Sequence, residues 1–289
     1  MSQFKLPVLG ASAKPVTPAD LILRSLHAEA IYDAALGDTV HLDIGTAIMS
    51  PDLPDVDMAN EIRDVQTPAG TSPDAATAAA LAVFAARGLR PLAWSFAGGR
   101  MDPDIAAALE THGYRHHVAE VWALNHPQIA GARSDLAVIS ARASYPSIRE
   151  ILTAVGADIA HEPPARIQQY AEAAVRTLDD PRVDALLALH GETPVGLAYL
   201  VTAGESGFLA DLYVHPAHRR SKVATTLLER IVELATRSRH RSLTLLCRPN
   251  NPAARALYEK TGWSKVGEVA SMRLDAHPDD IATPAQPLS

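Results

Sequence analysis

The chain lacks several features that mark particular protein classes. It has a single cysteine, Cys247, so no disulfide can form within it, and the apolar surroundings of this thiol favour a small core residue over a nucleophile. It has no apolar run long enough to span a bilayer and no N-terminal signal-peptide pattern. A surplus of positive charge is also missing, because the net charge is −7, which argues against bulk nucleic-acid binding. We therefore expect a cytoplasmic protein without membrane or nucleic-acid partners.

The composition favours a folded, two-domain chain. Its 289 residues exceed the roughly 100–200 residues of a usual domain. Hydrophobic residues make up 47% and charged residues 20%, which is enough for a packed core and argues against extensive disorder. Alanine and leucine supply much of the apolar content, which favours a helix-rich mixed fold.

An internal repeat gives the first sign of organisation. Asp102-Pro103 opens a short helix that ends at Gly113 before the aromatic Tyr114, and Asn251-Pro252 opens one that ends at Gly262 before Trp263. Asp and Asn are good N-caps, proline suits the first helical turn and glycine suits the end. The distance from cap to glycine is the same in both, and a strand-like stretch follows each helix, over 118–124 and 266–274.

The same shift relates segments upstream of these helices. With this shift in residue number, the helical stretch 74–87 aligns with 223–237, and the strand-like stretch 91–96 nearly aligns with 242–247. A tandem duplication explains this order better than coincidence does. The segment 125–134, which mixes Asn, Pro, Gly and Ser, is the predicted linker. We therefore predict domains at 1–128 and 129–275, and a loose proline-rich tail at 276–289.

Alternating helices and strands in the second half predict a mixed α/β sheet. The predicted strands are 136–141, 183–189, 195–201, 207–214, 243–247 and 266–274, and the predicted helices are 147–155, 164–178, 223–237 and the capped helix after Asn251.

A basic loop joins one of these strands to a helix. The strand ends at His215-Pro216, and a loop containing Arg219, Arg220 and Lys222 leads into the helix that starts near Val223. The first N–H groups of a helix have no internal partner and carry partial positive charge, so such a junction can bind an anion. From this segment alone, a solvated basic loop is an equally good interpretation.

Two motifs resemble those of the GNAT superfamily of N-acetyltransferases. The strand, basic loop and helix resemble its motif A, with Arg219 at the first position and Ala224 at the last. The segment 251–263, NPAARALYEKTGW, resembles motif B in its Asn, Ala, Leu, Tyr, Lys, Gly and aromatic positions. The resemblance covers about 135–274, and the first half matches as a weak copy. It implies an α/β fold of two tandem GNAT-like domains, each a twisted mixed sheet flanked by helices.

The resemblance also implies acetyl-CoA, or another acyl-CoA, as cosubstrate and a set of residues around it. Backbone groups of the strand end would align the cofactor, the basic loop and first helical turn would take its pyrophosphate, and motif B would lie beside them. The implied cofactor-binding residues are Leu212, Tyr213, Val214, Arg219, Arg220, Ser221, Lys222, Val223, Ala224, Asn251, Ala254 and Tyr258. Lys222 departs from the pattern, because the family has a glycine there that lets the backbone approach the phosphates.

The resemblance assigns Tyr258 as the acid that protonates the leaving thiolate, although its place on an apolar helix face also suits a core aromatic. Asp211 is a candidate general base, and His161-Glu162 is another. Three histidines, His112, His116 and His117, lack the Cys or carboxylate pattern of a metal site, so no metal is expected.

The first half lacks a basic loop, because the corresponding segment 70–73 has no Arg or Lys and ends in a proline. We therefore expect this half to have lost CoA binding and to shape the substrate cleft or act as a pseudo-dimeric partner. The leading hypothesis is an N-acetyltransferase acting on a small-molecule or peptide amine, as a monomer or homodimer. A non-catalytic CoA sensor and an unrelated nucleotide-binding α/β protein are the alternatives.

Overall fold

The computed structural model describes residues 16–128, 131–159 and 162–274. Its helices are α1 (Pro18–Ala34), α2 (Pro73–Ala85), α3 (Pro103–Thr111), α4 (Tyr145–Ala157), α5 (Pro164–Arg176), α6 (Val223–Arg237) and α7 (Pro252–Lys260). Its strands are β1 (Asp38–Leu42), β2 (Gly45–Met49), β3 (Glu61–Val65), β4 (Ala93–Phe96), β5 (Tyr114–Leu124), β6 (Leu136–Ser140), β7 (Val183–His190), β8 (Thr193–Ala203), β9 (Ser206–Val214), β10 (Ser242–Cys247) and β11 (Trp263–Leu274). Short 3₁₀ turns lie between them, among them η1 (Asp57–Ala59).

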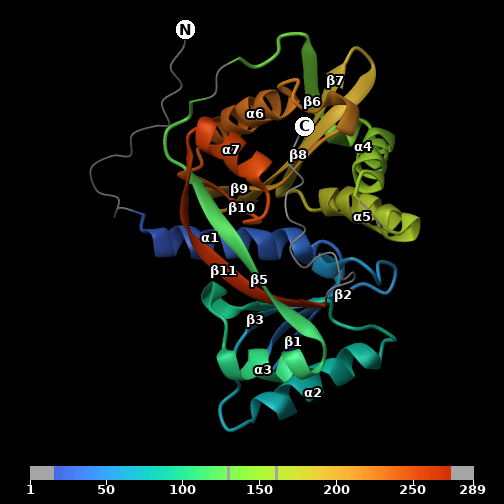
Figure 1. Ribbon diagram of the computed structural model, residues 1–289, viewed down its shortest axis with the longest axis vertical. Helices are drawn as coiled ribbons and strands as arrows, with labels where there is room; N and C mark the ends of the chain where they lie inside the picture. Colours follow the sequence, from blue (N-terminus) through green and yellow to red (C-terminus); the bar gives the residue numbers. More distant parts are fainter. Residues whose placement is uncertain (1–15, 129–130, 160–161, 275–289) are drawn as a thin grey trace.

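These strands form one mixed sheet in the order β1-β2-β3-β4-β11-β5-β10-β9-β8-β7-β6. The two halves of the chain form opposite ends of the molecule and share one succession of elements (Figure 1). The succession β1-β2-β3-α2-β4-α3-β5 recurs as β7-β8-β9-α6-β10-α7-β11, with a parallel pair, β3–β4 or β9–β10, in each. The predicted fold class, a tandem mixed α/β sheet flanked by helices, is confirmed.

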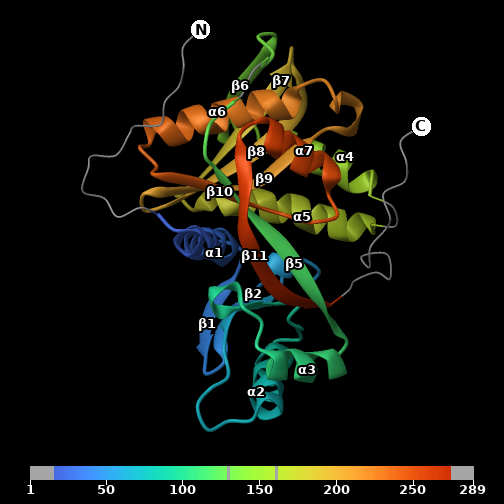
Figure 2. The ribbon, with the colours of Figure 1, turned by 60° about the vertical axis from the view of Figure 1, so that its left-hand side comes forward.

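The long strands β5 and β11 are exchanged between the halves. Strand β5 of the first half lies between β10 and β11, and β11 of the second half lies between β4 and β5. All these contacts are antiparallel, and β5 and β11 pair along their whole length, from Trp263↔Leu124 to Leu274↔Tyr114. A bulge between Lys265 and Gly267 accommodates the extra residue of β11. The two strands cross the middle of the molecule side by side (Figure 2), so neither half has a complete sheet of its own.

Helix α1 lies between the two ends of the molecule (Figure 1). It begins with a capping box in which the Thr17 side chain accepts from the Asp20 N–H and the Asp20 carboxylate accepts from the Thr17 N–H, and Pro18 occupies its first turn. Its Ala28, Ile31 and Tyr32 belong to the apolar core formed with α4, α5 and β7–β9. The first half therefore contributes a helix to the core of the second half.

Most of the predicted elements are present, with shifted ends. Helix α6 has the predicted bounds, and α3 and α7 have the predicted caps, Asp102 and Asn251, each accepting from backbone N–H groups of the first turn. Strands β5 and β11 begin at the aromatic residue after the glycine, earlier than predicted. Helix α1 and strands β1–β3 were not predicted from the sequence, and the predicted tail lies outside the described residues. Within the described ranges, no helix has the length and apolar character needed to cross a bilayer.

Candidate functional site

The parallel strands β9 and β10 separate partway along their length. They pair from Ser206↔Ser242 to Leu209↔Leu245. Beyond that point β9 continues beside β8 to Val214, while β10 continues beside β5 to Cys247. A register shift in the β8–β9 ladder leaves Ala210 as an extra residue where the separation begins. The backbone edge of residues 211–214 therefore faces the gap between two parallel strands.

The loop after β9 leads to an uncapped helix end. Lys222 is the N-cap of α6 but supplies no side-chain cap, and the first turn contains no acidic residue. Arg220 and Lys222 both adopt the left-handed conformation, with φ of 61° and 65°. Such a conformation costs roughly 1–2 kcal/mol in a residue with a Cβ, and strain of this kind concentrates at ligand sites. The first N–H groups of α6 are thus left without intrahelical or side-chain acceptors.

The basic side chains of the loop make contacts of their own. Arg219 forms an ion pair with Asp158 at the end of α4, and both side chains are nearly half exposed. The Lys222 ammonium lies against the linker, where a Cβ added to Gly131 would stand 2.8 Å from Nζ. The linker also crosses the start of α6, because the Arg133 N–H donates to Thr226 Oγ1 at 3.0 Å. Lys222 therefore points its charge toward the linker.

The corresponding junction in the first half is closed. The Ser72 side chain caps α2 by accepting from the Ala75 N–H, Pro73 removes one donor, and Asp74 places a carboxylate in the first turn. Strand β3 ends at Val65, which pairs with Phe96 at the end of β4, so no unpaired strand segment extends beyond the parallel pair. This junction has neither the free donors nor the strand gap of its counterpart.

Tyr258 lies on α7, in the core cluster of the second half. It is 8% exposed, and its ring contacts Trp122 and Trp263 at centroid distances of 6.4 and 5.9 Å. Burial, helped by the nearby Cys247 and Asp211, raises the pKa of its hydroxyl well above the usual value. The phenol is therefore a neutral hydrogen-bond donor at physiological pH. Burial also raises the pKa of the Cys247 thiol to about 11, which keeps it un-ionised.

Asp211 lies on β9 directly after the bulge, at the gap between the strands. It accepts a hydrogen bond from the Tyr32 hydroxyl of α1 at 2.8 Å, and the Tyr213 hydroxyl lies near it. Burial raises the pKa of Asp211 above its usual value, although the two hydroxyls oppose this effect. A carboxylate with a raised pKa is better matched to accepting a proton near neutral pH.

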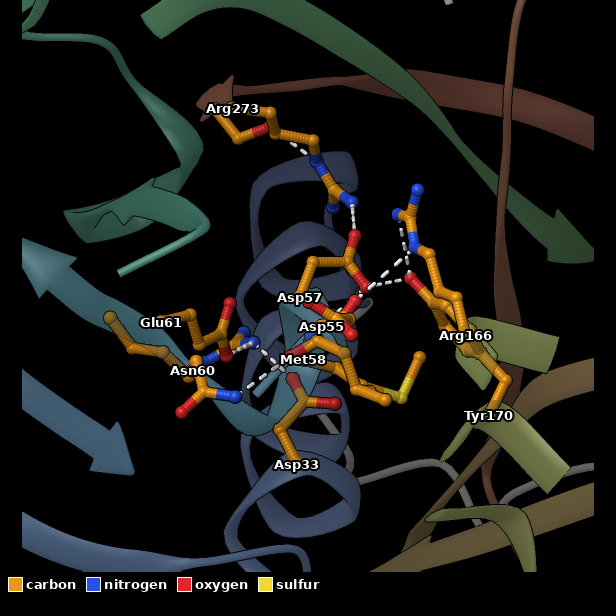
Figure 3. A network of polar contacts seen from close by, with 12 residues as sticks. Asp33, Asp55, Asp57, Met58, Asn60, Glu61, Arg166, Tyr170 and Arg273 are labelled. Carbon is orange, nitrogen blue, oxygen red and sulfur yellow. Dashed lines mark hydrogen bonds and ion pairs between the residues drawn. The ribbon is translucent and has the colours of Figure 1, made fainter. Parts of the chain in front are cut away.

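A network of polar contacts joins the two halves beside this gap (Figure 3). Asp57 on η1 of the first half accepts from the Tyr170 hydroxyl of α5 at 2.9 Å and forms an ion pair with Arg273 of β11. Burial opposes ionisation of Asp57, but Arg273 and Tyr170 hold its pKa below the usual value. The neighbouring Asp55 exchanges hydrogen bonds with Gln169 at 2.9 and 2.7 Å.

The structure brings most of the predicted site residues into one region, formed by the end of β9, the following loop and the start of α6. Asn251 is occupied as a helix cap, since its side chain accepts from the Ala254 N–H at 3.1 Å. Two other residues were predicted as candidate general bases. His161 lies outside the described residues, and Glu162 forms an ion pair with Arg166. Within the described ranges no three His, Cys, Asp or Glu side chains are placed so that they could hold a metal ion.

Sequence reasoning missed the residues that reach this region from elsewhere. They are Tyr32, Asp57, Arg133, Asp158 and Arg273. The capping box at Thr17 was a usable signal for α1, and hence for the element that carries Tyr32. The other four depend on contacts between distant segments and leave no local pattern.

Comparison with known proteins finds a family model that matches part of the second half. Residues 146–263 match the model of the Acetyltransferase (GNAT) family. A mycothiol acetyltransferase of Clavibacter sepedonicus is 37% identical over 90 residues, which cover 30% of this chain and 28% of the relative. A mycothiol acetyltransferase of Kineococcus radiotolerans is 36% identical over 93 residues, covering 31% and 30%. The chain thus matches less than a third of the length of either relative.

Solved structures resemble the whole fold. A GCN5-related N-acetyltransferase from Kribbella flavida superposes with a TM-score of 0.58 at 15% identity, covering 90% of this chain and 97% of its own. A conserved protein of unknown function from Staphylococcus epidermidis superposes with a TM-score of 0.59 at 12% identity, covering 82% and 93%. At these identities the likeness concerns the fold, and it extends over both halves.

Proposed function

We propose that the chain transfers an acetyl group from acetyl-CoA to a primary amine by direct attack of the amine on the thioester, because residues 146–263 match the model of the Acetyltransferase (GNAT) family. The observation that carries this proposal is the combination of a strand gap and an open helix end at one junction. The free edge of β9 offers backbone groups to an extended pantetheine arm, and the start of α6 offers N–H groups to a pyrophosphate.

The residues of this junction divide the binding between them. Backbone groups of Leu212, Tyr213 and Val214 align the thioester along the strand edge. Backbone N–H groups of residues 221–224 bind the pyrophosphate at the positive end of the helix, and Arg219 and Arg220 add full charges. Lys222 contributes through its backbone, because its ammonium lies against Gly131. Asn251 caps α7, the helix that carries Ala254 and Tyr258, and Tyr258 lies near Cys247 of β10 and Asp211 of β9.

The reaction requires one bond to form and one to break. The neutral amine forms a C–N bond with the thioester carbonyl, the C–S bond breaks, and CoA leaves as a thiolate. Asp211 accepts the proton that the amine loses, since its raised pKa favours proton uptake. Tyr258 donates a hydrogen bond to the leaving sulfur. Full proton transfer from Tyr258 to a thiolate of pKa near 8.5 would be uphill, because burial raises the pKa of this phenol.

A non-catalytic CoA sensor is the second candidate, and two observations favour it. Arg219 is already paired with Asp158, and Lys222 holds a strained conformation at a position where the family has glycine. Both features could let the junction bind CoA without aligning the thioester for transfer. They leave the strand gap and Asp211 intact, however, so we favour the transferase.

Two measurements test the proposal together. Calorimetric titration with acetyl-CoA measures binding, and release of the CoA thiol in the presence of a panel of primary amines measures transfer. We expect saturable binding and amine-dependent thiol release with an acetylated product. Binding without transfer to any amine would favour the sensor, and stabilisation by ATP or NAD but not by CoA would point to a nucleotide-binding protein instead.

A further inference from the structure

Strand β5 carries a buried carboxylate from the first half of the chain into the second (Figure 2). Glu120 lies where β5 pairs with β10, directly opposite Cys247, and is 3% exposed. Cys247 ends β10 at the border of the strand gap. Burial opposes ionisation of Glu120, but Lys265, Trp122 and Arg255 hold its pKa below the usual value. The first half therefore places a negative charge beside the candidate site.

One oxygen of Glu120 contacts two side chains that flank Tyr258. Its Oε2 accepts a hydrogen bond from the Trp122 indole N–H at 3.2 Å and forms an ion pair with Arg255 of α7, 3.3 Å from Nε. The Trp122 ring packs against the ring of Tyr258, and Arg255 lies three residues before Tyr258 on α7. Residues three apart are neighbours on a helix surface. The carboxylate thus restrains both the ring beside Tyr258 and the helical turn that precedes it.

The other oxygen of Glu120 connects the same group to β11. Its Oε1 accepts a hydrogen bond from the Lys265 ammonium at 3.0 Å. Strand β11 begins two residues earlier at Trp263, whose ring is the second aromatic neighbour of Tyr258. Charge-assisted hydrogen bonds are shorter and stronger than neutral ones. Glu120 therefore restrains β5, β11 and α7 around one tyrosine.

Helix α7 has few apolar contacts that would fix its position without this carboxylate. Among its nine described residues Tyr258 is the one that is buried, and Ala254 and Leu257 are partly buried against the core. An element with few buried apolar contacts opens and shifts more readily than a core helix. The ion pair between Arg255 and Glu120 adds a polar contact to this small apolar face.

The geometry points to Glu120 as a positioning residue for Tyr258, supplied by the first half of the chain. This inference rests on the proposed transferase function, in which Tyr258 donates a hydrogen bond to the leaving sulfur. Such a donor acts only within hydrogen-bond reach of the sulfur, and a misplacement of about 1 Å can cost about 10²-fold in rate. The first half thus acts on the reaction through a tyrosine of the second half.

A double-mutant cycle on kcat tests this coupling in the full-length protein. Glu120→Gln keeps an acceptor for the Trp122 N–H but removes the charge that holds Arg255 and Lys265. It should lower kcat about tenfold and leave the KM for acetyl-CoA unchanged. In a Tyr258→Phe background the same substitution should lower kcat by less than about twofold, because the hydroxyl that Glu120 positions is gone. An equal loss in both backgrounds would overturn the inference.

Glu268→Gln is the matched control. Glu268 lies opposite Glu120 in the β5–β11 ladder and forms an ion pair with the same lysine, but its side chain is 53% exposed. The variant removes one carboxylate from Lys265 and leaves the contacts of Glu120 with Trp122 and Arg255 in place. It should leave kcat unchanged. A loss equal to that of Glu120→Gln would assign the effect to Lys265 and overturn the inference.

A second variant keeps the test open if Glu120→Gln does not fold. Arg255→Met removes the partner on α7, whose side chain is 40% exposed, and leaves Glu120 paired with Lys265. It should lower kcat about tenfold with Tyr258 present and by less than about twofold in the Tyr258→Phe background. An unchanged kcat would overturn the inference.

The indole N–H resonances of the three tryptophans test the inference without a transfer step. Trp94 lies in the core of the first half, Trp122 donates to Glu120, and the Trp263 indole N–H has no hydrogen-bond partner in the described part of the chain. In protein containing isotope-labelled tryptophan, Glu120→Gln should shift the signals of Trp122 and Trp263 and leave that of Trp94 in place. Glu268→Gln should leave the Trp263 signal in place.

The two measurements separate this inference from the proposed function. A shift of the Trp122 signal alone would show that Glu120 fixes the indole but not Tyr258, and would overturn the inference in a protein that still acetylates amines. Shifts of both signals in a protein that acetylates no amine would refute the transferase and retain the coupling of β5 to Tyr258.

Discussion

Both halves of the molecule contain the same strand-loop-helix junction, but the helix start is capped in the first half and uncapped in the second. In the first half, the Ser72 side chain, Pro73 and Asp74 close the start of α2. In the second half, α6 starts without a side-chain cap, and Arg219, Arg220 and Lys222 precede it. Strand β9 extends beyond its parallel partner, whereas β3 ends together with β4. The two junctions therefore share one fold and differ in the backbone donors that they leave free.

The comparison also shows what each half gives the other. The closed half supplies α1, η1 and β5 to the open half, and the open half returns β11. The exchanged strands make the sheet continuous across both repeats. The first half is thereby a structural partner of the second half.

The largest expected effect comes from removing the first half. A chain lacking residues 1–128 should yield no folded monomer, because β10 and β11 lose β5 between them and the core around β8 and β9 loses α1. Size-exclusion chromatography and circular dichroism measure this. The control is the full chain with a protease site in the linker 125–134, which should stay folded after cleavage. A monomeric, folded truncation that binds acetyl-CoA would show that the halves are independent.

Closing the open junction should abolish cofactor binding. Ala224→Asp places a carboxylate in the first turn of α6, as Asp74 does in α2. At about 4 Å, and with an effective dielectric constant near 20, a carboxylate and a phosphate repel by roughly 4 kcal/mol. The affinity for acetyl-CoA should fall by at least about 100-fold, while the melting temperature should stay equal or rise, because acidic residues stabilise helix starts. Competition binding with a fluorescent CoA analogue measures the loss.

The same substitution in the closed junction provides the control for this experiment. Ala75→Asp adds a carboxylate to the first turn of α2, where the Ser72 cap already occupies the backbone N–H. It should leave the affinity for acetyl-CoA unchanged. A comparable loss of affinity in this variant would mean that the first half also binds cofactor.

Removing one hydroxyl at Tyr258 should separate binding from turnover. Tyr258→Phe keeps the ring packed against Trp122 and Trp263, so the fold and the KM for acetyl-CoA should hardly change. The kcat should fall about 10²-fold, the lower end for a positioned donor. Steady-state kinetics with the best amine acceptor measures the split. An unchanged kcat would assign Tyr258 to the core alone.

Asp211→Asn should raise the melting temperature and lower kcat. Burial raises the pKa of Asp211, so the native state binds a proton more readily than the unfolded chain, and the free energy of unfolding decreases as the pH rises above 3.8 through the raised value. The asparagine variant lacks this penalty and should melt at a higher temperature at neutral pH, with a shallower dependence on pH. Its kcat should fall by about 10- to 100-fold. Full activity would exclude Asp211 as the base.

The smallest expected effect concerns the ion pair beside the basic loop. Asp158→Ala frees Arg219 from its exposed carboxylate partner. Exposed pairs contribute about 0–1 kcal/mol, so the affinity for acetyl-CoA should increase by no more than about fivefold. Calorimetry at low salt measures the gain, and the gain should shrink as the salt concentration rises. Weaker binding in this variant would mean that Asp158 positions Arg219 for the cofactor.

Local patterns were enough to predict the repeat and the elements of the second half. Caps at Asp102 and Asn251, glycines at the helix ends and the apolar face of α6 depend on neighbours in sequence, and the structure contains them. The exchange of β5 and β11 could not be predicted in this way. Both strands have the same apolar character whether they pair within a half or across halves, so only the assembled sheet decides between these pairings.

The candidate site likewise contains residues that local motifs predict and residues that only distant contacts bring in. The basic loop and Tyr258 are contiguous with recognisable motifs and were predicted, whereas Tyr32 and Arg273 reach Asp211 and Asp57 from segments more than a hundred residues away in the chain. Lys222 was predicted as a cofactor-binding residue, yet its ammonium lies against Gly131 of the linker, and its backbone is left-handed with φ of 65°. Side-chain direction at such a position follows from backbone geometry that the residue type does not specify.

The number of acetyl-CoA molecules bound per chain tests the contrast between the two junctions most directly. Calorimetric titration of the full-length protein should give one site per chain, and Ala224→Asp should eliminate it. Two sites, or one site that survives Ala224→Asp, would contradict the assignment of the cofactor to the start of α6.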